Sequence, residues 1–263
     1  MTDVVAERRP IPASRDGKIR WWDVLIVIVG GNVVGGLLAI LLAVATIFFI
    51  KRYHYFPISL NHVSKSFPVT MVSLAASDLG ILSVLWLVAR RRFRPLFSHY
   101  FAPIPLGTVG WAAFSGLAIA VVLGGMNELL SRLGLVKFKA SDFELALVPH
   151  SVAQVFVAVA MTILFVPFLE EMLFRGLILD WLRRVGGPWV AALLSAALFS
   201  LVHCEFLFHQ GAQGWIYTLN IFLIGAAMAI WVLRTGSLQS SFALHATYNA
   251  IGILTAAYLS WPS

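Results

Sequence analysis

Glu170, Glu171 and Arg175 lie inside an otherwise apolar stretch of the chain, in the sequence EEMLFR. Ionisable side chains in an apolar span cost about 2.5–3.5 kcal/mol each on insertion scales, so they tend to face the interior of a helical bundle and to serve a function. Glu171 and Arg175 are four residues apart on one helical face and can form an ion pair, which lowers the cost of both. Glu170 points about 100° away from Glu171 and is free to face a cavity.

Two further stretches carry side chains that can exchange protons or donate hydrogen bonds. The sequence FSLVH ends in His203, and HATYN contains His245 and Asn249. His245 and Asn249 are spaced to share one helical face. Taken singly, each of these residues is more often an interhelical hydrogen-bonding group than a catalyst. Their occurrence together with the two glutamates is what favours a chemical role.

The elements that position these residues are apolar helices. Of the 263 residues, 60% are hydrophobic and 12% are charged, and the mean hydropathy is +0.87, whereas soluble domains hold roughly 45–50% apolar residues. Stretches of about 18 or more apolar residues recur, each long enough to cross a hydrocarbon core of about 30 Å. The sequence therefore predicts an all-α fold, a polytopic transmembrane helical bundle of about seven spans. The expected spans are 22–50, 67–89, 107–131, 151–182, 188–204, 213–233 and 238–260.

These spans divide the chain into three parts. Residues 1–21 are expected to form a cytosolic basic tail, residues 22–150 three N-terminal transmembrane helices, and residues 151–263 a core of four spans. The tail lacks a long apolar core and so differs from a cleavable signal peptide. The tail and the loops on its side of the membrane hold twelve Arg and Lys residues, against six on the other side. This asymmetry favours a cytoplasmic N-terminus.

The charge and cysteine content narrow the expected partners. The net charge is +7, and the basic residues cluster beside apolar segments, which suits membrane lipids with anionic headgroups better than nucleic acid. The single cysteine, Cys204, excludes an intramolecular disulfide and a multi-cysteine metal site. Glycines in the first span are expected to let helices approach closely.

Distances along the helices place the polar residues at a common depth. Glu170 is fourteen residues before the expected turn after the fourth span, and His203 is fifteen residues after that turn. At about 1.5 Å per residue, both lie roughly 21–23 Å from the turn, so an antiparallel hairpin brings them side by side. His245 and Asn249 lie roughly 14–20 Å from the next turn on the same side. Four polar groups from three helices are therefore expected to converge within the membrane.

The three sequences follow one another in the order EExxxR, FxxxH and HxxxN. In these motifs the chain resembles the CPBP intramembrane peptidases (CAAX protease and bacteriocin-processing, or Abi), a family that includes the Rce1-type CAAX endopeptidases. The resemblance covers about 155–252, which makes 151–263 the expected catalytic core. Residues 1–150 add spans without a matching motif.

The resemblance implies a glutamic endopeptidase that hydrolyses a peptide bond without a metal or other cofactor. Glu170 matches the general base of the family, and His203 would help it orient and deprotonate water. His245 and Asn249 would donate hydrogen bonds to the oxyanion, a contribution of about 2.7–4 kcal/mol per donor. Glu171 and Arg175 would support the site electrostatically. The expected substrate is a membrane-embedded or membrane-associated protein or peptide, prenylated or not, and the expected location is a bacterial cell membrane.

Three other interpretations remain open. A zinc-dependent peptidase could use two histidines and a glutamate, although the chain has no HExxH sequence and Asn249 is a poor zinc ligand. Within the cluster His203, Glu205 and His209, the two histidines are six residues apart and do not share a helical face. A cysteine peptidase based on Cys204 is disfavoured because the neighbouring His203 side chain diverges from it.

A non-catalytic protein is the alternative from a different class. A membrane scaffold, an immunity protein or a small transporter could use the buried polar groups for packing or proton movement. The complete set of motifs favours an enzyme, because a scaffold would tolerate the loss of Glu170 or His203.

Overall fold

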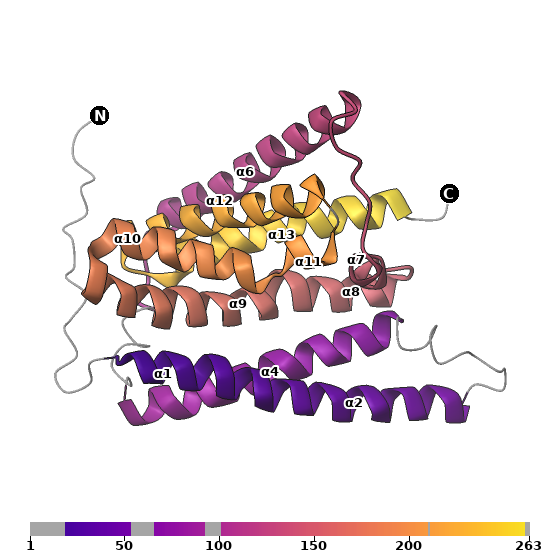
Figure 1. Cartoon of the computed structure of the whole chain (residues 1–263), viewed down its shortest axis with the longest axis horizontal. Helices are drawn as coiled ribbons and strands as arrows, with labels where there is room; N and C mark the ends of the chain where they lie inside the picture. The colour runs from indigo at the N-terminus through magenta and orange to yellow at the C-terminus, as the bar shows by residue number, and fades with distance from the viewer. Residues whose placement is uncertain (1–18, 54–65, 93–100, 210, 261–263) are drawn as a thin grey trace.

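The structure is a computed structural model that describes residues 19–53, 66–92, 101–209 and 211–260 (Figure 1). Its regular elements in these ranges are all helical. They run in the order α1 (Trp21–Leu25), η1 (Ile26–Gly30), α2 (Gly31–Tyr53), α4 (Phe67–Arg92), α6 (Leu106–Arg132), α7 (Asp142–Leu147), α8 (Val152–Val159), η2 (Ala160–Phe165), α9 (Val166–Glu171), η3 (Met172–Ile178), α10 (Leu179–Val202), α11 (Glu205–Phe208), α12 (Ala212–Thr235) and α13 (Leu238–Ser260), where η marks a π-helical segment.

Five of the helical stretches are long and apolar enough to cross a membrane: Trp21–Arg52, Phe67–Arg90, Leu106–Arg132, Val152–Phe208 and Ala212–Thr235. The fourth stretch contains two of the expected spans, because Gly187 leaves the helical conformation at φ 79° and ψ 174°. α13 is outside this set, since polar side chains such as His245 and Asn249 lower its hydropathy. The predicted helical membrane bundle is confirmed, with a span count close to seven. Of the predicted tail, only residues 19–21 are described.

The N-terminal helices form a closely packed pair that lies along α9. α1, η1 and α2 make one long helix, and α4 runs beside it (Figure 1). A Cβ atom on Gly35 would collide with the backbone of Ser77, and one on Gly80 would collide with Gly35. The close approach expected from the glycines of the first span is therefore found at Gly35. Gly36, by contrast, faces open space.

The C-terminal helices pack around a common apolar core. α10 packs on α12, α12 on α13, and α6 crosses α13, where a Cβ on Gly116 would collide with the carbonyl of Leu244. The core includes Phe199, Met228 and Leu238, each almost fully buried. α12 ends at Gly236, whose positive φ of 69° suits a glycine C-cap and starts the turn into α13. This turn fixes the depth of the polar residues on α13.

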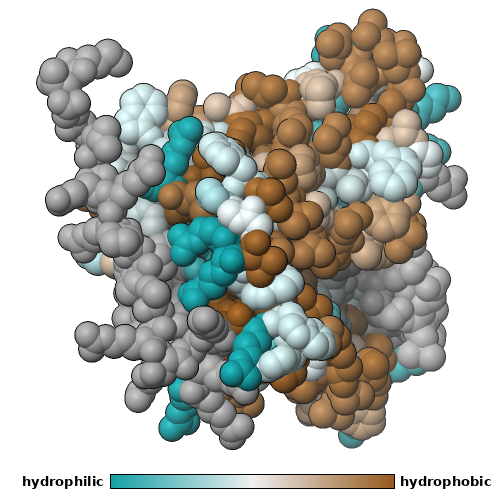
Figure 2. Space-filling view, turned by 60° about the vertical axis from the view of Figure 1, so that its left-hand side comes forward, coloured by the Kyte–Doolittle hydropathy of each residue, from teal (hydrophilic) through white to brown (hydrophobic). Residues whose placement is uncertain are grey.

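The outer surface is largely apolar, as a lipid-facing bundle requires. Figure 2 shows broad hydrophobic areas interrupted by smaller hydrophilic patches. Leucine, isoleucine, valine and phenylalanine side chains along α2, α6 and α10 are exposed, among them Leu37, Val121 and Leu193. A contiguous apolar surface of this kind is unusual on a soluble monomer. The protein is therefore an integral, multi-pass membrane protein.

Candidate active site

Glu170, His203 and His245 meet between three helices. Glu170 is on α9, His203 is the C-cap of α10, and His245 is on α13. Glu170 Oε1 lies 3.7 Å from His203 Nε2, and Glu170 Oε2 lies 3.5 Å from His245 Nε2. The Glu170 side chain is 23% exposed, so water can reach its carboxylate. The structure thus brings together three of the four side chains expected to carry chemistry.

The Nδ1 atom of each histidine is already engaged. His203 Nδ1 donates to the Phe199 carbonyl at 2.7 Å, and His245 Nδ1 is 3.0 Å from Glu171 Oε1. A carbonyl oxygen can only accept, so the proton of His203 is on Nδ1. The Nε2 atom of each ring is therefore the one turned toward Glu170. His245 also joins the two glutamates, with one ring nitrogen directed at each.

Glu171 and Arg175 form a buried ion pair beneath this group. Arg175 donates to Glu171 Oε1 at 3.1 Å, and the side chains are 0% and 1% exposed for Arg175 and Glu171, respectively. Arg175 also donates to the Gly225 carbonyl on α12 at 3.0 Å. Its guanidinium lies 4.4 Å from the centre of the Phe199 ring. The arginine thus ties η3 to α10 and α12 and leaves Glu171 free to hold His245.

Phe199 is a residue whose role the sequence interpretation missed. Its buried ring makes edge contacts with Phe174, His203 and His245, at centroid distances of 5.0, 4.6 and 5.7 Å. The Phe199 ring thus contacts both histidines, and the Phe199 carbonyl accepts the hydrogen bond from His203 Nδ1. Its position four residues before His203 was the available signal, because i and i+4 side chains meet on a helix.

Asn249 is positioned by a hydrogen bond to a π-helical segment. Its Nδ2 donates to the Thr162 carbonyl at 2.8 Å, in η2, rather than to Glu170. Pro167 follows η2 and lacks an N–H, and its ring would crowd the carbonyl of Ile163 in a regular α-helix. The wider π-helical turn relieves this crowding and frees carbonyls that α13 can satisfy. Asn249 lies one turn beyond His245 on the same helix.

A second polar cluster joins α11 to the segment before α8. His209 Nε2 lies 3.1 Å from Glu205 Oε2 and 3.4 Å from Glu144 Oε2. Gln213 donates to His209 Nδ1 at 2.8 Å and also to the Lys139 carbonyl. The sequence suggested a cluster of His203, Glu205 and His209. In the structure the cluster consists of Glu144, Glu205 and His209. Across the described ranges, no group of three or more His, Cys, Asp or Glu side chains is arranged to hold a metal ion.

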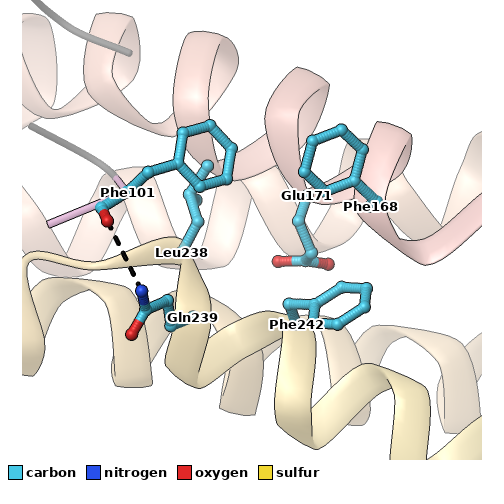
Figure 3. A pocket seen from close by; sticks show the side chains of 6 residues that line it. All are labelled: Phe101, Phe168, Glu171, Leu238, Gln239 and Phe242. Carbon is cyan, nitrogen blue, oxygen red and sulfur yellow. Dashed lines mark hydrogen bonds between the residues drawn. The ribbon is translucent and has the colours of Figure 1, made fainter. Parts of the chain in front are cut away.

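An apolar cavity of about 220 Å³ lies beside the Glu171 carboxylate (Figure 3). It is lined by Phe101, Phe168, Glu171, Leu238, Gln239 and Phe242. Figure 3 shows the Glu171 carboxylate between the rings of Phe168 and Phe242. Gln239 closes one end of the cavity through a hydrogen bond of 3.4 Å to the Phe101 carbonyl. The cavity thus reaches the residue that holds His245.

Comparison with known proteins shows what this region is similar to. Residues 152–251 match the family model described as type II CAAX prenyl endopeptidase Rce1-like. A curated protein of Escherichia coli, described as an uncharacterized 24.3 kDa protein, is 28% identical over 166 residues, which cover 60% of this chain and 72% of that protein. No solved structure matches the chain. Residues 152–251, which contain all the motif residues, are thus similar to the Rce1-like family, and this similarity supports an intramembrane CAAX-type protease at family level.

Proposed function

We propose that the protein is a glutamic endopeptidase that cleaves a membrane-associated protein or peptide without a bound metal. The observation that carries this proposal is the position of the Glu170 carboxylate, 3.7 Å from His203 Nε2 and 3.5 Å from His245 Nε2. The partial exposure of Glu170 allows a water molecule to reach it, while the bundle excludes bulk solvent from the ion pair below.

In the proposed reaction, Glu170 removes a proton from water as the water oxygen attacks the peptide carbonyl carbon. His203, held through its Nδ1, orients that water with its Nε2. The carbonyl π bond opens and its electron pair goes to oxygen, so the tetrahedral intermediate carries an oxyanion. When the intermediate collapses, the C–N bond breaks and Glu170 returns the proton to the leaving amine. General acid–base catalysis of this kind contributes about 10²–10⁴-fold to the rate.

The oxyanion is assigned to Asn249 and to His245 in its doubly protonated form, in which Nδ1–H donates to Glu171 and Nε2–H donates to the oxyanion. Both residues are on one face of α13. The His245 ring is held by a hydrogen bond from its Nδ1 to Glu171, and the Asn249 amide is held by a hydrogen bond from its Nδ2 to the Thr162 carbonyl. Donors fixed in advance of the reaction stabilise the developing charge without reorganising. In this assignment the Asn249 amide donates to the oxyanion with its second N–H, the one that is not bonded to the Thr162 carbonyl.

The substrate is expected to present an apolar group beside the scissile bond. The cavity formed by Phe101, Phe168 and Phe242 reaches Glu171, which holds His245, and has an apolar lining. A prenylated or otherwise hydrophobic segment fits such a lining. The proposed location is a bacterial cell membrane, with the N-terminus in the cytoplasm and membrane lipids around the bundle.

One observation favours a zinc-dependent variant as the second candidate. Both Nε2 atoms face the Glu170 carboxylate, and each Nδ1 is bonded to a carbonyl or carboxylate, as in zinc sites. Purified protein in detergent should cleave a lipid-modified peptide library at the same rate with and without a chelator. Activity lost to the chelator and restored by zinc would establish the second candidate instead. Absence of any turnover, also on membrane proteins from a deletion strain, would favour the non-catalytic scaffold.

A further inference from the structure

The chain leaves the helical conformation directly after His203. α10 ends at Val202 with His203 as its C-cap, and Cys204 follows in the left-handed conformation, at φ 55° and ψ 24°. In the described ranges, Cys204 is the one residue other than glycine with a positive φ. Its Cβ atom lies close to the following carbonyl oxygen in this conformation, whereas Gly236 at the end of α12 adopts it freely. The turn after His203 therefore needs support from its surroundings.

The segment after this turn, α11, packs tightly on the first turn of α12. A Cβ atom on Gly214 would lie 2.7 Å from the His209 carbonyl oxygen and 2.8 Å from that of Glu205, so the two backbones touch. The Phe206 ring stacks on the Trp215 ring, with centroids 5.4 Å apart. α11 cannot shift along α12 without breaking these contacts, and the turn before it is held from this side.

His209, which follows α11, ties it to the connector between α6 and α8, residues 133–151. Its side chain is 3% exposed. Its Nδ1 accepts a hydrogen bond from the Gln213 amide at 2.8 Å, and the same amide nitrogen donates to the Lys139 carbonyl at 2.6 Å. With Nδ1 as an acceptor, the proton of the neutral ring is on Nε2, which faces Glu205 at 3.1 Å and Glu144 at 3.4 Å. The ring thus links α11, α12 and the connector.

We propose that His209 is a positioning residue of the active site, which locks the turn after His203 and so holds the His203 imidazole near Glu170. The proposal rests on the function proposed for Glu170 and His203. The last carbonyls of a helix lack partners within it, and a helix end frays unless they are held. Here the Phe199 carbonyl is bonded to the His203 ring itself, so fraying of this last turn would release the ring. His209 acts through the turn at Cys204 and does not contact the substrate.

The lock extends beyond the segment that is similar to known endopeptidases. That segment covers residues 152–251, whereas Lys139 and Glu144 precede it and contact Gln213 and His209. In this proposal the connector, which the sequence motifs do not include, supports the active site through the position of His203.

The test removes the His209 ring and measures kcat and KM separately. In His209→Leu the turn loses its lock, and kcat should fall by about 10-fold or more, because a displacement of about 1 Å can cost about 10²-fold. KM should stay within about 2-fold of wild type, since His203 orients water and not substrate. His150→Leu is the control, because His150 is an exposed histidine in the same connector, and its kcat should match wild type. A wild-type kcat in His209→Leu would overturn the proposal.

A second substitution distinguishes a lock on the turn from a general loss of packing. Cys204→Gly in the His209→Leu background should restore kcat to within about 3-fold of wild type, because glycine adopts a positive φ without the lock. Cys204→Val, with His209 intact, should lower kcat as His209→Leu does, because a β-branched side chain disfavours a positive φ. Cys204→Val also decides the question if His209→Leu does not fold. A failed rescue, or a wild-type kcat in Cys204→Val, would contradict the proposal.

The His203 ring can also be observed without turnover, by nitrogen NMR of isotope-labelled histidines. Wild type should show His203 with its proton on Nδ1, as its bond to the Phe199 carbonyl requires. His209→Leu should show a mixture of the two tautomers, and the double variant with Cys204→Gly the single form. An unchanged His203 tautomer in His209→Leu would show that His209 does not hold the ring. If the wild-type protein cleaves no peptide, the proposed function fails, while the tautomer still reports on the turn.

Discussion

Removal of the Glu171 carboxylate tests the buried ion pair on which the site is built. In Glu171→Ala, the Arg175 guanidinium, which is 0% exposed in the wild type, keeps the Gly225 carbonyl and the rings of Phe199 and Phe174 but has no anionic partner on its own helix. Leaving one member of a buried pair uncompensated costs about 3–5 kcal/mol. At about 2–4 °C per kcal/mol for a chain of this size, the thermal midpoint in detergent should fall by roughly 6–20 °C.

The chain offers a matched control for this variant. Glu128 and Arg132 on α6 form an ion pair at the same i,i+4 spacing, with side chains 61% and 76% exposed. Exposed pairs contribute about 0–1 kcal/mol, so Glu128→Ala should melt close to wild type. The double variant Glu171→Ala with Arg175→Met should recover much of the loss, because no unpaired charge remains. A Glu171→Ala protein that melts like Glu128→Ala would show that the buried pair does not stabilise the fold. If that stable protein were also inactive, the roles assigned to Glu170 and Glu171 would be exchanged.

Three further substitutions test separate parts of the site. His203→Ala should lower kcat by about 10²-fold or more with little change in KM, because His203 orients water and not substrate; a change confined to KM would contradict this role. Asn249→Leu should lower kcat by about 10²–10³-fold, the usual loss for one oxyanion donor, and a wild-type kcat would remove Asn249 from the mechanism. Phe242→Trp should reduce the cavity volume and raise KM for apolar substrates with kcat retained; an unchanged KM would show that the cavity does not hold the substrate.

The meeting of Glu170 with His203 was predictable from the sequence. Glu170 and His203 lie on the two helices of one hairpin with a glycine turn at its tip. Residue counts along two straight helices therefore predict that the two side chains lie at the same depth. The ion pair of Glu171 and Arg175 was predictable as well, because i,i+4 spacing on one helix fixes it locally. Features of this kind require only helix geometry and the place of one turn.

Other features depend on how distant segments pack, and residue spacing alone does not determine that packing. The bond from Asn249 to Thr162 exists because η2 is π-helical, a local rearrangement that Pro167 favours but does not specify. The packing of α4 against α9 likewise joins two helices that are far apart in the sequence.

The Glu170 carboxylate is proposed to activate the attacking water, and Glu170→Gln is the substitution that removes this role alone. The substitution keeps the size of the side chain and removes the base. Peptide hydrolysis by the purified variant should fall by at least about 10²-fold, with the thermal midpoint and detergent elution profile of wild type. A folded Glu170→Gln protein that cleaves the substrate at the wild-type rate would show that Glu170 is not the general base.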